Sequence, residues 1–314
     1  MTEKWIAGYK IEKEIGSGSM GTCHHVSDPT NPEDHYCLKT TKEEIDNIPL
    51  NPRNISFLKE GGKFAKDYRS PKAMALRFQL EIHYLIELQS SSGIPNIYNW
   101  GNTHSSQIPD AIPHGFLLCE LIPGKSLRDI LREREQPLPL QQILSIGQQV
   151  STIAQKAHEQ NILHRDIKPQ NILWKETEER ASLVDWGLGA YLDPQTKRLL
   201  NPETEGHILG TPAFFAPEQA DGCNKDVGIH SDIFNIGGTL YNLLSKKPLY
   251  TGNDAWYMLN KAEFVDFDEL PTNIPKIVRD LVGKALNMNP EDRYASAKDF
   301  AEAIEDVAEN LEES

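Results

Sequence analysis

The feature that most constrains this chain is the segment Ile-Leu-His-Arg-Asp-Ile-Lys-Pro-Gln-Asn-Ile-Leu at residues 162–173. Short apolar pairs at both ends enclose a run of polar and charged residues. Apolar runs favour burial, so the polar residues between them are expected to lie beside a core rather than free in solvent. Because Pro169 disfavours a continuous helix, the pattern predicts a rigid loop that holds charged side chains in fixed positions.

Three side chains of this loop suit the transfer of a phosphoryl group. Asp166 can orient a hydroxyl group, Lys168 can face the charge of a moving phosphoryl group, and Asn171 offers an amide oxygen to a metal ion. The alternative is a surface turn with ordinary charges. The pattern His-Arg-Asp-x-Lys-x-x-Asn at 164–171 fixes five positions. At roughly 5% for each residue type, such a pattern would occur by chance in about one chain of this length in ten thousand. The spacing therefore favours a catalytic loop.

The loop resembles the catalytic loop of eukaryotic-type (Hanks-type) protein kinases, and a lysine two residues after the aspartate is its serine/threonine form. The resemblance implies an α+β, bilobal fold, with a small β-rich lobe and one main helix at about 8–121 and a larger, mostly helical lobe at about 124–305. It implies a serine/threonine protein kinase that uses ATP and Mg²⁺. One kinase domain at 8–305 would then be followed by an acidic tail at 306–314.

A G-x-G-x-x-G pattern at 16–21 follows residues 9–15, whose apolar positions recur near the period of a strand. Dinucleotide sites share this pattern, but their helix begins at the third glycine. Here the chain continues to a turn at 27–32, so we expect a strand-turn-strand. In the resembled family such a hairpin covers the nucleotide, which assigns ATP contacts to Ile15, Gly16, Ser17, Gly18, Ser19, Met20, Gly21 and Cys23.

Lys39, in a third expected strand at 35–40, resembles the family lysine that pairs with the α- and β-phosphates. Taken alone it could also be an exposed lysine on an edge strand. Glu81, in a helix expected at 71–89 with Phe78, Ile82, Leu85 and Gln89 on one face, is its predicted ion-pair partner. The 42-residue interval is about twice that of the family and predicts an insertion at 42–70. Glu60 has a more usual interval, but two glycines follow it and would break a helix.

Two further expected strands, at 95–101 and 116–121, lead to a segment at 120–124 that resembles the hinge between kinase lobes. The resemblance assigns adenine contacts to the backbone near Glu120 and Ile122 and places Cys119 at the rear of the pocket. Asp185, in Asp-Trp-Gly, resembles the second metal ligand beside Asn171, with tryptophan in place of the usual phenylalanine.

The rest of the chain matches the structural motifs of the same family. We expect Thr211 to bridge Asp166 and Lys168, and Glu218 of an Ala-Pro-Glu to pair with Arg293. Buried helices are predicted at 139–160 and 231–244. Asp232, in the second of them, should accept backbone hydrogen bonds from the catalytic loop. Ser296 and Asp299 should cap a final helix with Phe300, Ile304 and Val307 inward. Gln219 after Ala-Pro-Glu is similar to bacterial members of the family.

Activation is also implied by the resemblance. Arg165, beside the catalytic aspartate, often marks kinases that are switched on by phosphorylation, and Thr196 and Thr204 are candidate sites. Glu203 and Glu205 flank Thr204, so a carboxylate could partly replace the phosphate there and leave the enzyme constitutively active.

Composition excludes some partners. A net charge of −14 argues against nucleic-acid binding, and no apolar run is long enough to cross a bilayer. The four cysteines form no C-x-x-C pair, which fits free thiols in a reducing, cytoplasmic compartment. The expected partners are proteins that carry a serine or threonine, including the chain itself through autophosphorylation.

Two other functions stay open at this point. A pseudokinase that acts as a binding module would share the fold without the transfer, and the long insertion before Glu81 is the one feature that favours it. A small-molecule kinase of related fold would lack a ledge for a peptide substrate. The intact Ala-Pro-Glu and the region of Thr211 shape such a ledge in the resembled family, so they argue against a small-molecule kinase.

Overall fold

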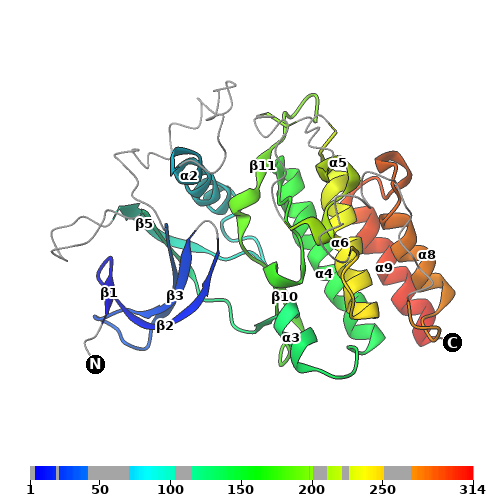
Figure 1. The fold of residues 1–314 in the computed structure, drawn as a ribbon, viewed down its shortest axis with the longest axis horizontal. Coiled ribbons are helices and arrows are strands. Elements are labelled where there is room, and N and C mark those ends of the chain that lie inside the picture. The colour runs from blue at the N-terminus through cyan, green and yellow to red at the C-terminus, as the bar shows by residue number, and fades with distance from the viewer. Residues whose placement is uncertain are drawn as a thin grey trace. The chain divides into compact units, whose positions relative to one another are not determined.

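The computed structural model describes residues 4–18, 21–41, 71–102, 115–197, 199–200, 211–220, 226–250 and 270–313, with only the backbone described at 71 and 72. The chain divides into two compact units, Met1–Ile122 and Pro123–Ser314. Figure 1 shows strands dominating the first unit and helices dominating the second. The insertion at 42–70, with Glu60, lies outside the described residues, as do Ser19, Met20 and Thr204.

The described part of the first unit forms a six-stranded antiparallel sheet in the order β1-β2-β3-β4-β6-β5. Its strands are β1 Trp5–Ile6, β2 Tyr9–Ser17, β3 Thr22–Ser27, β4 His35–Thr40, β5 Ile97–Asn102 and β6 Gly115–Glu120. Because side chains alternate between faces, Leu38 and its cross-strand partner Leu118 lie on one face, where they join a buried apolar cluster. Lys39, opposite Cys23 and Leu117, lies on the other face.

Helix α2, Pro71–Glu87, packs against β5 and β6. Phe78, Ile82 and Leu85 are buried, as their spacing predicts. Gln89 was expected on the same face, and this is wrong: the helix ends two residues earlier and the Gln89 side chain is exposed. Ser90 has a left-handed φ of 66°, a conformation that often terminates a helix.

The second unit is built around buried helices. Its helices are α3 Leu127–Glu133, α4 Leu140–Glu159, α5 Pro217–Ala220, α6 Ile229–Ser245, α8 Lys276–Ala285 and α9 Ala297–Glu312. Helix α4 packs against α6 and α9. A Cβ atom added to Gly147 of α4 would lie 2.8 Å from a methyl carbon of Leu240, so these helices approach too closely for a larger residue.

Two small sheets support the loops of the second unit. Strands β7 Lys125–Ser126, β9 Ile172–Lys175 and β10 Arg180–Leu183 form one, and β8 Ile162–Leu163 pairs with β11 Ala190–Tyr191 in the other. The catalytic loop predicted at 162–173 therefore begins in β8 and ends in β9. A short 3₁₀ turn, Pro169–Asn171, lies inside it, because proline is tolerated at the first position of such a turn.

The β-rich first unit and mostly helical second unit confirm the α+β fold expected from the sequence. The predicted final helix with Val307 inward is present and continues through Glu312, so residues 306–312 of the segment expected as an acidic tail are helical. Val307 is buried, and Gln141 of α4 donates a hydrogen bond of 3.2 Å to the carbonyl oxygen of Ala308. Packing against α4 thus keeps this acidic segment helical.

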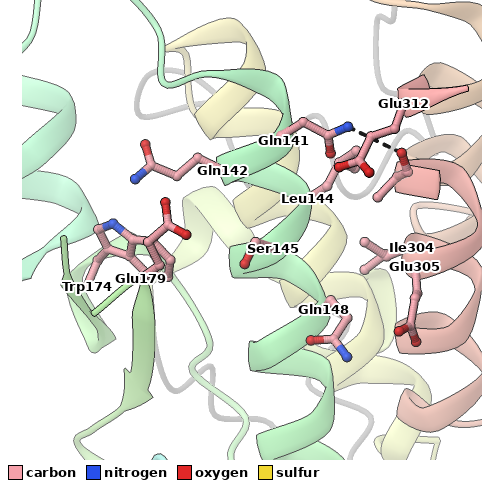
Figure 2. A pocket seen from close by; sticks show the side chains of 11 residues that line it. Gln141, Gln142, Leu144, Ser145, Gln148, Trp174, Glu179, Ile304, Glu305 and Glu312 are labelled. Atoms are coloured by element: carbon pink, nitrogen blue, oxygen red, sulfur yellow. Dashed lines mark hydrogen bonds between the residues drawn. The ribbon is translucent and has the colours of Figure 1, made fainter. Parts of the chain in front are cut away.

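A groove in the second unit lies between α4, α9 and the β9–β10 hairpin, as Figure 2 shows. Its walls combine polar and apolar groups and include Gln141, Gln148, Trp174 and Glu305. Among the described residues, none of those that the sequence assigns to nucleotide, metal or catalysis lines this groove, so it is separate from the candidate active site. No helix in the described ranges has the length and apolar character of a membrane span.

Candidate active site

A buried carboxylate organises the catalytic loop. Asp232 of α6 accepts the backbone N–H groups of His164 and Arg165 at 3.0 and 2.8 Å, and the Nε2 atom of His158 lies 2.9 Å from it. Burial raises the pKa of Asp232, but the hydrogen bonds from His158 and the loop outweigh it, so the net pKa is lowered. The predicted bonds from the loop to Asp232 are therefore confirmed, and the carboxylate stays ionised.

His164 fixes the peptide that precedes Asp166. Its Nδ1 atom accepts the Asp166 backbone N–H at 3.2 Å, and its Nε2 atom lies 3.1 Å from the Val184 carbonyl oxygen. This pattern requires the proton on Nε2, and burial, which lowers the pKa of His164, favours that neutral form. The His164 ring meets the buried Trp186 ring edge-on at 4.6 Å. Sequence reasoning gave His164 no role, although its place beside Asp166 was visible.

Asp166 lies at the centre of a compact polar cluster. Lys168 Nζ donates to Asp166 Oδ2 and to Thr211 Oγ1, each at 2.6 Å. Asn171 Nδ2 donates to the Asp166 carbonyl oxygen at 2.9 Å and to its Oδ2 atom at 3.1 Å. The predicted contact of Thr211 with Lys168 is present, but it is the ammonium group of Lys168 that joins Thr211 to Asp166.

The pKa of the Asp166 carboxyl is raised. Burial is the largest cause, because a low-dielectric environment disfavours the charged form, while the ammonium group of Lys168 opposes the rise. A carboxylate of raised basicity that keeps a cation beside it suits a group that accepts a proton from a hydroxyl.

Asn171 and Asp185 offer the oxygen atoms that a hard cation prefers. The Asn171 amide nitrogen is engaged by Asp166, which leaves its amide oxygen for a ligand. Asp185 is exposed and has a left-handed φ of 63°, and the neighbouring Val184 N–H donates to the Asn171 carbonyl oxygen at 2.9 Å. Two oxygen ligands from adjacent segments fit Mg²⁺, which binds few protein ligands and keeps several waters.

In the first unit, Lys39 and Glu81 form the ion pair that the sequence predicted. Lys39 Nζ donates to both carboxylate oxygens of Glu81 at 2.7 Å, and the two side chains are only 10% and 4% exposed. Helix α2 therefore brings Glu81 to β4 across the long interval in the sequence. The pair holds an ammonium group in a defined place on the sheet face that also carries Cys23.

The glycine-rich segment forms the predicted hairpin. Gly16 lies opposite Cys23 and Ser17 opposite Thr22, and the Gly18 N–H donates to the Gly21 carbonyl oxygen at 2.9 Å. A Cβ atom at Gly21 would lie 2.1 Å from the carbonyl oxygen of Thr40, so only glycine allows this approach to β4. A hairpin, in place of a helix start, removes the dinucleotide alternative. Ile15 precedes it with a half-exposed side chain.

The hinge candidate Glu120 belongs to a polar network, here called the Asn96 network. Its N–H donates to the Asn96 carbonyl oxygen at 2.8 Å, so this N–H is not available to adenine. Its carboxylate accepts Asn96 N and Nδ2 at 3.2 and 2.9 Å, and Asn96 Oδ1 accepts Ser90 N at 3.0 Å. Gln89 and Ile97 exchange two further bonds, at 3.3 and 3.0 Å. The network joins the end of α2 to β5 and β6.

Comparison with known proteins agrees with this geometry. The family model described as "Protein kinase domain" matches residues 61–305. Among similar proteins, serine/threonine-protein kinase PknA of Mycobacterium tuberculosis is 30% identical over 297 residues, which cover 94% of this chain and 60% of PknA. Serine/threonine-protein kinase PknL of the same species is 30% identical over 247 residues, covering 78% of the chain and 57% of PknL.

A probable serine/threonine-protein kinase of Clostridium perfringens is 28% identical over 249 residues, covering 78% of the chain and 34% of that protein. The chain thus spans between a third and three fifths of the length of these relatives. The family match begins after the glycine-rich hairpin and Lys39, but the likeness to PknA, which covers 94% of the chain, extends to Lys39 as well.

Proposed function

The chain belongs to the protein kinase family, and from this premise we propose that it transfers the γ-phosphoryl group of ATP to a serine or threonine hydroxyl of a protein. The observation that supports this best is the cluster in which Lys168 joins Asp166 and Thr211 while Asn171 contacts Asp166. Every position that phosphoryl transfer requires is filled by a suitable residue, which disfavours a pseudokinase.

In the proposed reaction, the substrate oxygen forms a bond to the γ-phosphorus as the bond from that phosphorus to the β-phosphate oxygen breaks. Asp166 orients the substrate hydroxyl and accepts its proton late, and Lys168 offsets charge on the transferring group. A kinase turning over about 10 times per second has a barrier of about 16 kcal/mol. Most of the lowering of the activation barrier must come from positioning and electrostatics, because a loose transition state needs little proton transfer to a base.

Each unit carries residues to which we assign nucleotide contacts. Lys39, held by Glu81, would bind the α- and β-phosphates, and backbone N–H groups of the glycine hairpin would cover them. Cys23 would cover adenine and Cys119 would lie at the rear of its pocket, while the Ile122 N–H would donate to adenine and the Glu120 carbonyl oxygen would accept from it. Members of this family use ATP with Mg²⁺. Asn171 and Asp185 would hold Mg²⁺, which neutralises phosphate charge when it is bound.

The structure bears on Thr196, one of the two candidate phosphorylation sites. Thr196 N and Oγ1 donate to Asp193 Oδ1 at 2.7 and 3.0 Å. A phosphate on Thr196 would face this carboxylate and be repelled by it. The contact therefore argues against Thr196 as an activating site and leaves Thr204, which lies outside the described residues, as the other candidate from the sequence.

Protein substrates and autophosphorylation are part of the proposal. Among the described residues, Cys23, Cys37 and Cys119 are free thiols. The cytoplasmic location and the exclusion of nucleic acid, which rests on the net charge of −14, stay predictions.

The direct test is a radiolabel assay. The protein is incubated with Mg²⁺ and γ-labelled ATP, alone and with a basic protein substrate, and label on serine or threonine is measured. We expect transfer by the unchanged chain and almost none by Asp166→Asn. Binding of Mg²⁺-ATP without any transfer would favour a binding module, and transfer to a metabolite alone would favour a small-molecule kinase.

The raised pKa of Asp166 predicts how activity depends on pH. The reaction needs the deprotonated carboxylate, so kcat should fall as pH falls through a pKa above that of an ordinary aspartate. Because Lys168 opposes the rise, Lys168→Met should move this acid limb to higher pH as well as lower kcat. The measurement is kcat against pH at saturating ATP and constant ionic strength. An acid limb at the position of an ordinary aspartate would contradict the prediction.

Glu81→Gln should weaken the contact that keeps the Lys39 ammonium group in place. The amide removes the negative charge from a buried, charge-assisted contact, which is worth about 1.5–3 kcal/mol. We expect kcat/KM for ATP to fall about 10- to 100-fold. The control is Glu87→Gln, at the exposed end of the same helix, which should change kcat/KM less than about twofold. Equal effects of the two variants would show that the ion pair has no special role.

A further inference from the structure

The peptide between Arg165 and Asp166 is held in an unfavourable conformation. Arg165 has a φ of 67°, in the left-handed region that costs a residue with a β-carbon roughly 1–2 kcal/mol. Such a conformation persists only when its surroundings impose it. It matters here because this peptide sets the direction in which the Asp166 side chain leaves the backbone.

The carbonyl oxygen and the N–H group of this peptide are both hydrogen-bonded, and so is the preceding N–H group of Arg165. The Arg165 N–H is bound by Asp232, and the Asp166 N–H is bound by His164. The Arg165 carbonyl oxygen accepts a hydrogen bond of 2.8 Å from Nε2 of Gln219 in the short helix α5. Asp232 and His164 belong to the frame of the catalytic loop already described, but Gln219 does not.

The orientation of the Gln219 amide is determined by its neighbours. Its Oε1 atom accepts the Ala216 N–H at 3.0 Å, and its Nε2 atom faces a carbonyl oxygen. The Ala216 N–H can only donate and the Arg165 carbonyl oxygen can only accept. Exchanging the oxygen and nitrogen of the Gln219 amide would therefore break both bonds. Asn235 of α6 donates to the same Oε1 at 2.9 Å and to the Phe214 carbonyl oxygen at 2.7 Å.

We propose that Gln219 is a positioning residue: its amide holds the Arg165 carbonyl and so fixes the peptide that aims the Asp166 carboxylate. Only 7% of Gln219 and 2% of Asn235 are exposed, so water does not replace these bonds readily. Because Ala216 and Phe214 belong to the segment that ends in Ala-Pro-Glu, Gln219 also ties that segment to the catalytic loop. The inference rests on the proposed kinase function.

Two variants of the full chain test the assignment. Gln219→Ala removes every bond of the amide, and kcat should fall about 10- to 100-fold while KM for ATP changes less than about twofold. Gln219→Glu keeps an acceptor for Ala216 and Asn235 but turns a carboxylate oxygen toward the Arg165 carbonyl oxygen. The two oxygens repel one another until the carboxyl is protonated, and it can then donate as the amide does.

The ratio of Gln219→Glu kcat to wild-type kcat should therefore rise as pH falls, because burial raises the pKa of a carboxyl at this site. The control is Gln136→Glu, at an exposed position of the same unit, whose ratio should stay near one at every pH. A purely structural role would lower thermal stability and kcat without recovery at low pH.

The outcomes separate the inference from the proposed function. If the unchanged chain transfers no phosphate, the proposed function fails. If the unchanged chain is active, then wild-type kcat in Gln219→Ala, or a Gln219→Glu ratio that does not change with pH, would overturn the role of Gln219.

Discussion

Asp166→Asn is expected to lower kcat about 10²- to 10⁴-fold while Mg²⁺-ATP still binds. Asparagine keeps the shape of the side chain, and its carbonyl oxygen can still accept from Lys168, which lies 2.6 Å from Asp166 Oδ2. What is lost is the negative charge that orients the substrate hydroxyl and accepts its proton. The backbone bonds to His164 and Asn171 do not depend on the side chain and should keep the loop in place.

Single-turnover phosphorylation and calorimetric binding of an ATP analogue measure the two effects separately. The matched control is Asp280→Asn, an exposed aspartate of α8 that pairs with Lys276, and it should leave kcat within about twofold of wild type. Unchanged turnover in Asp166→Asn would refute its assignment. Loss of nucleotide binding would show instead that the substitution had damaged the site as a whole.

Arg293→Met should destabilise the protein by about 3–5 kcal/mol, the second large effect that we expect. Arg293 Nη1 and Nη2 donate to the two carboxylate oxygens of Glu218 at 2.7 and 2.9 Å, and the Arg293 side chain is 0% exposed. It also donates to the carbonyl oxygens of His230, Asn287 and Met288. Without arginine, a buried carboxylate loses its counter-charge and three carbonyls lose a donor.

Urea unfolding followed by tryptophan fluorescence measures the loss. Replacing both partners, Glu218→Met with Arg293→Met, should recover part of the stability, because no unpaired charge then remains buried. Lys276→Met, which breaks an exposed ion pair, should cost about 0–1 kcal/mol and serves as the control. A loss below about 1 kcal/mol in Arg293→Met would contradict the prediction.

The contacts that could be predicted from the sequence are those in which both contacting residues belong to recognisable segments. The Lys39–Glu81 pair, the Glu218–Arg293 pair and the bonds to Asp232 all join residues within recognisable segments, so their partners could be named although they lie far apart in the chain. The helices at 139–160 and 231–244 were predictable because their apolar periodicity is strong.

The contacts that could not be predicted depend on how segments approach one another. Nothing local distinguishes Gln219, which lies beside the Arg165 carbonyl, from an exposed glutamine, because the fold alone brings α5 to the loop. A final helix with Val307 inward was predicted, but its extension to Glu312 was not, because the acidic residues at 306–312 have the composition of a solvated tail. They form a helix because Val307 reaches the interior, and one buried residue per turn is a weak signal among so many charges.

The Asn96 network has a mechanical consequence for helix α2. It fastens Gln89 to Ile97 of β5 and Ser90 to Asn96 directly before β5, so we expect a tilt of the helix to pivot about that end. Glu81 lies about 12 Å from the pivot at 1.5 Å per residue, and a swing of about 10° would displace it by roughly 2 Å. That movement exceeds what a 2.7 Å contact tolerates, so a small rotation about this anchor disconnects Glu81 from Lys39.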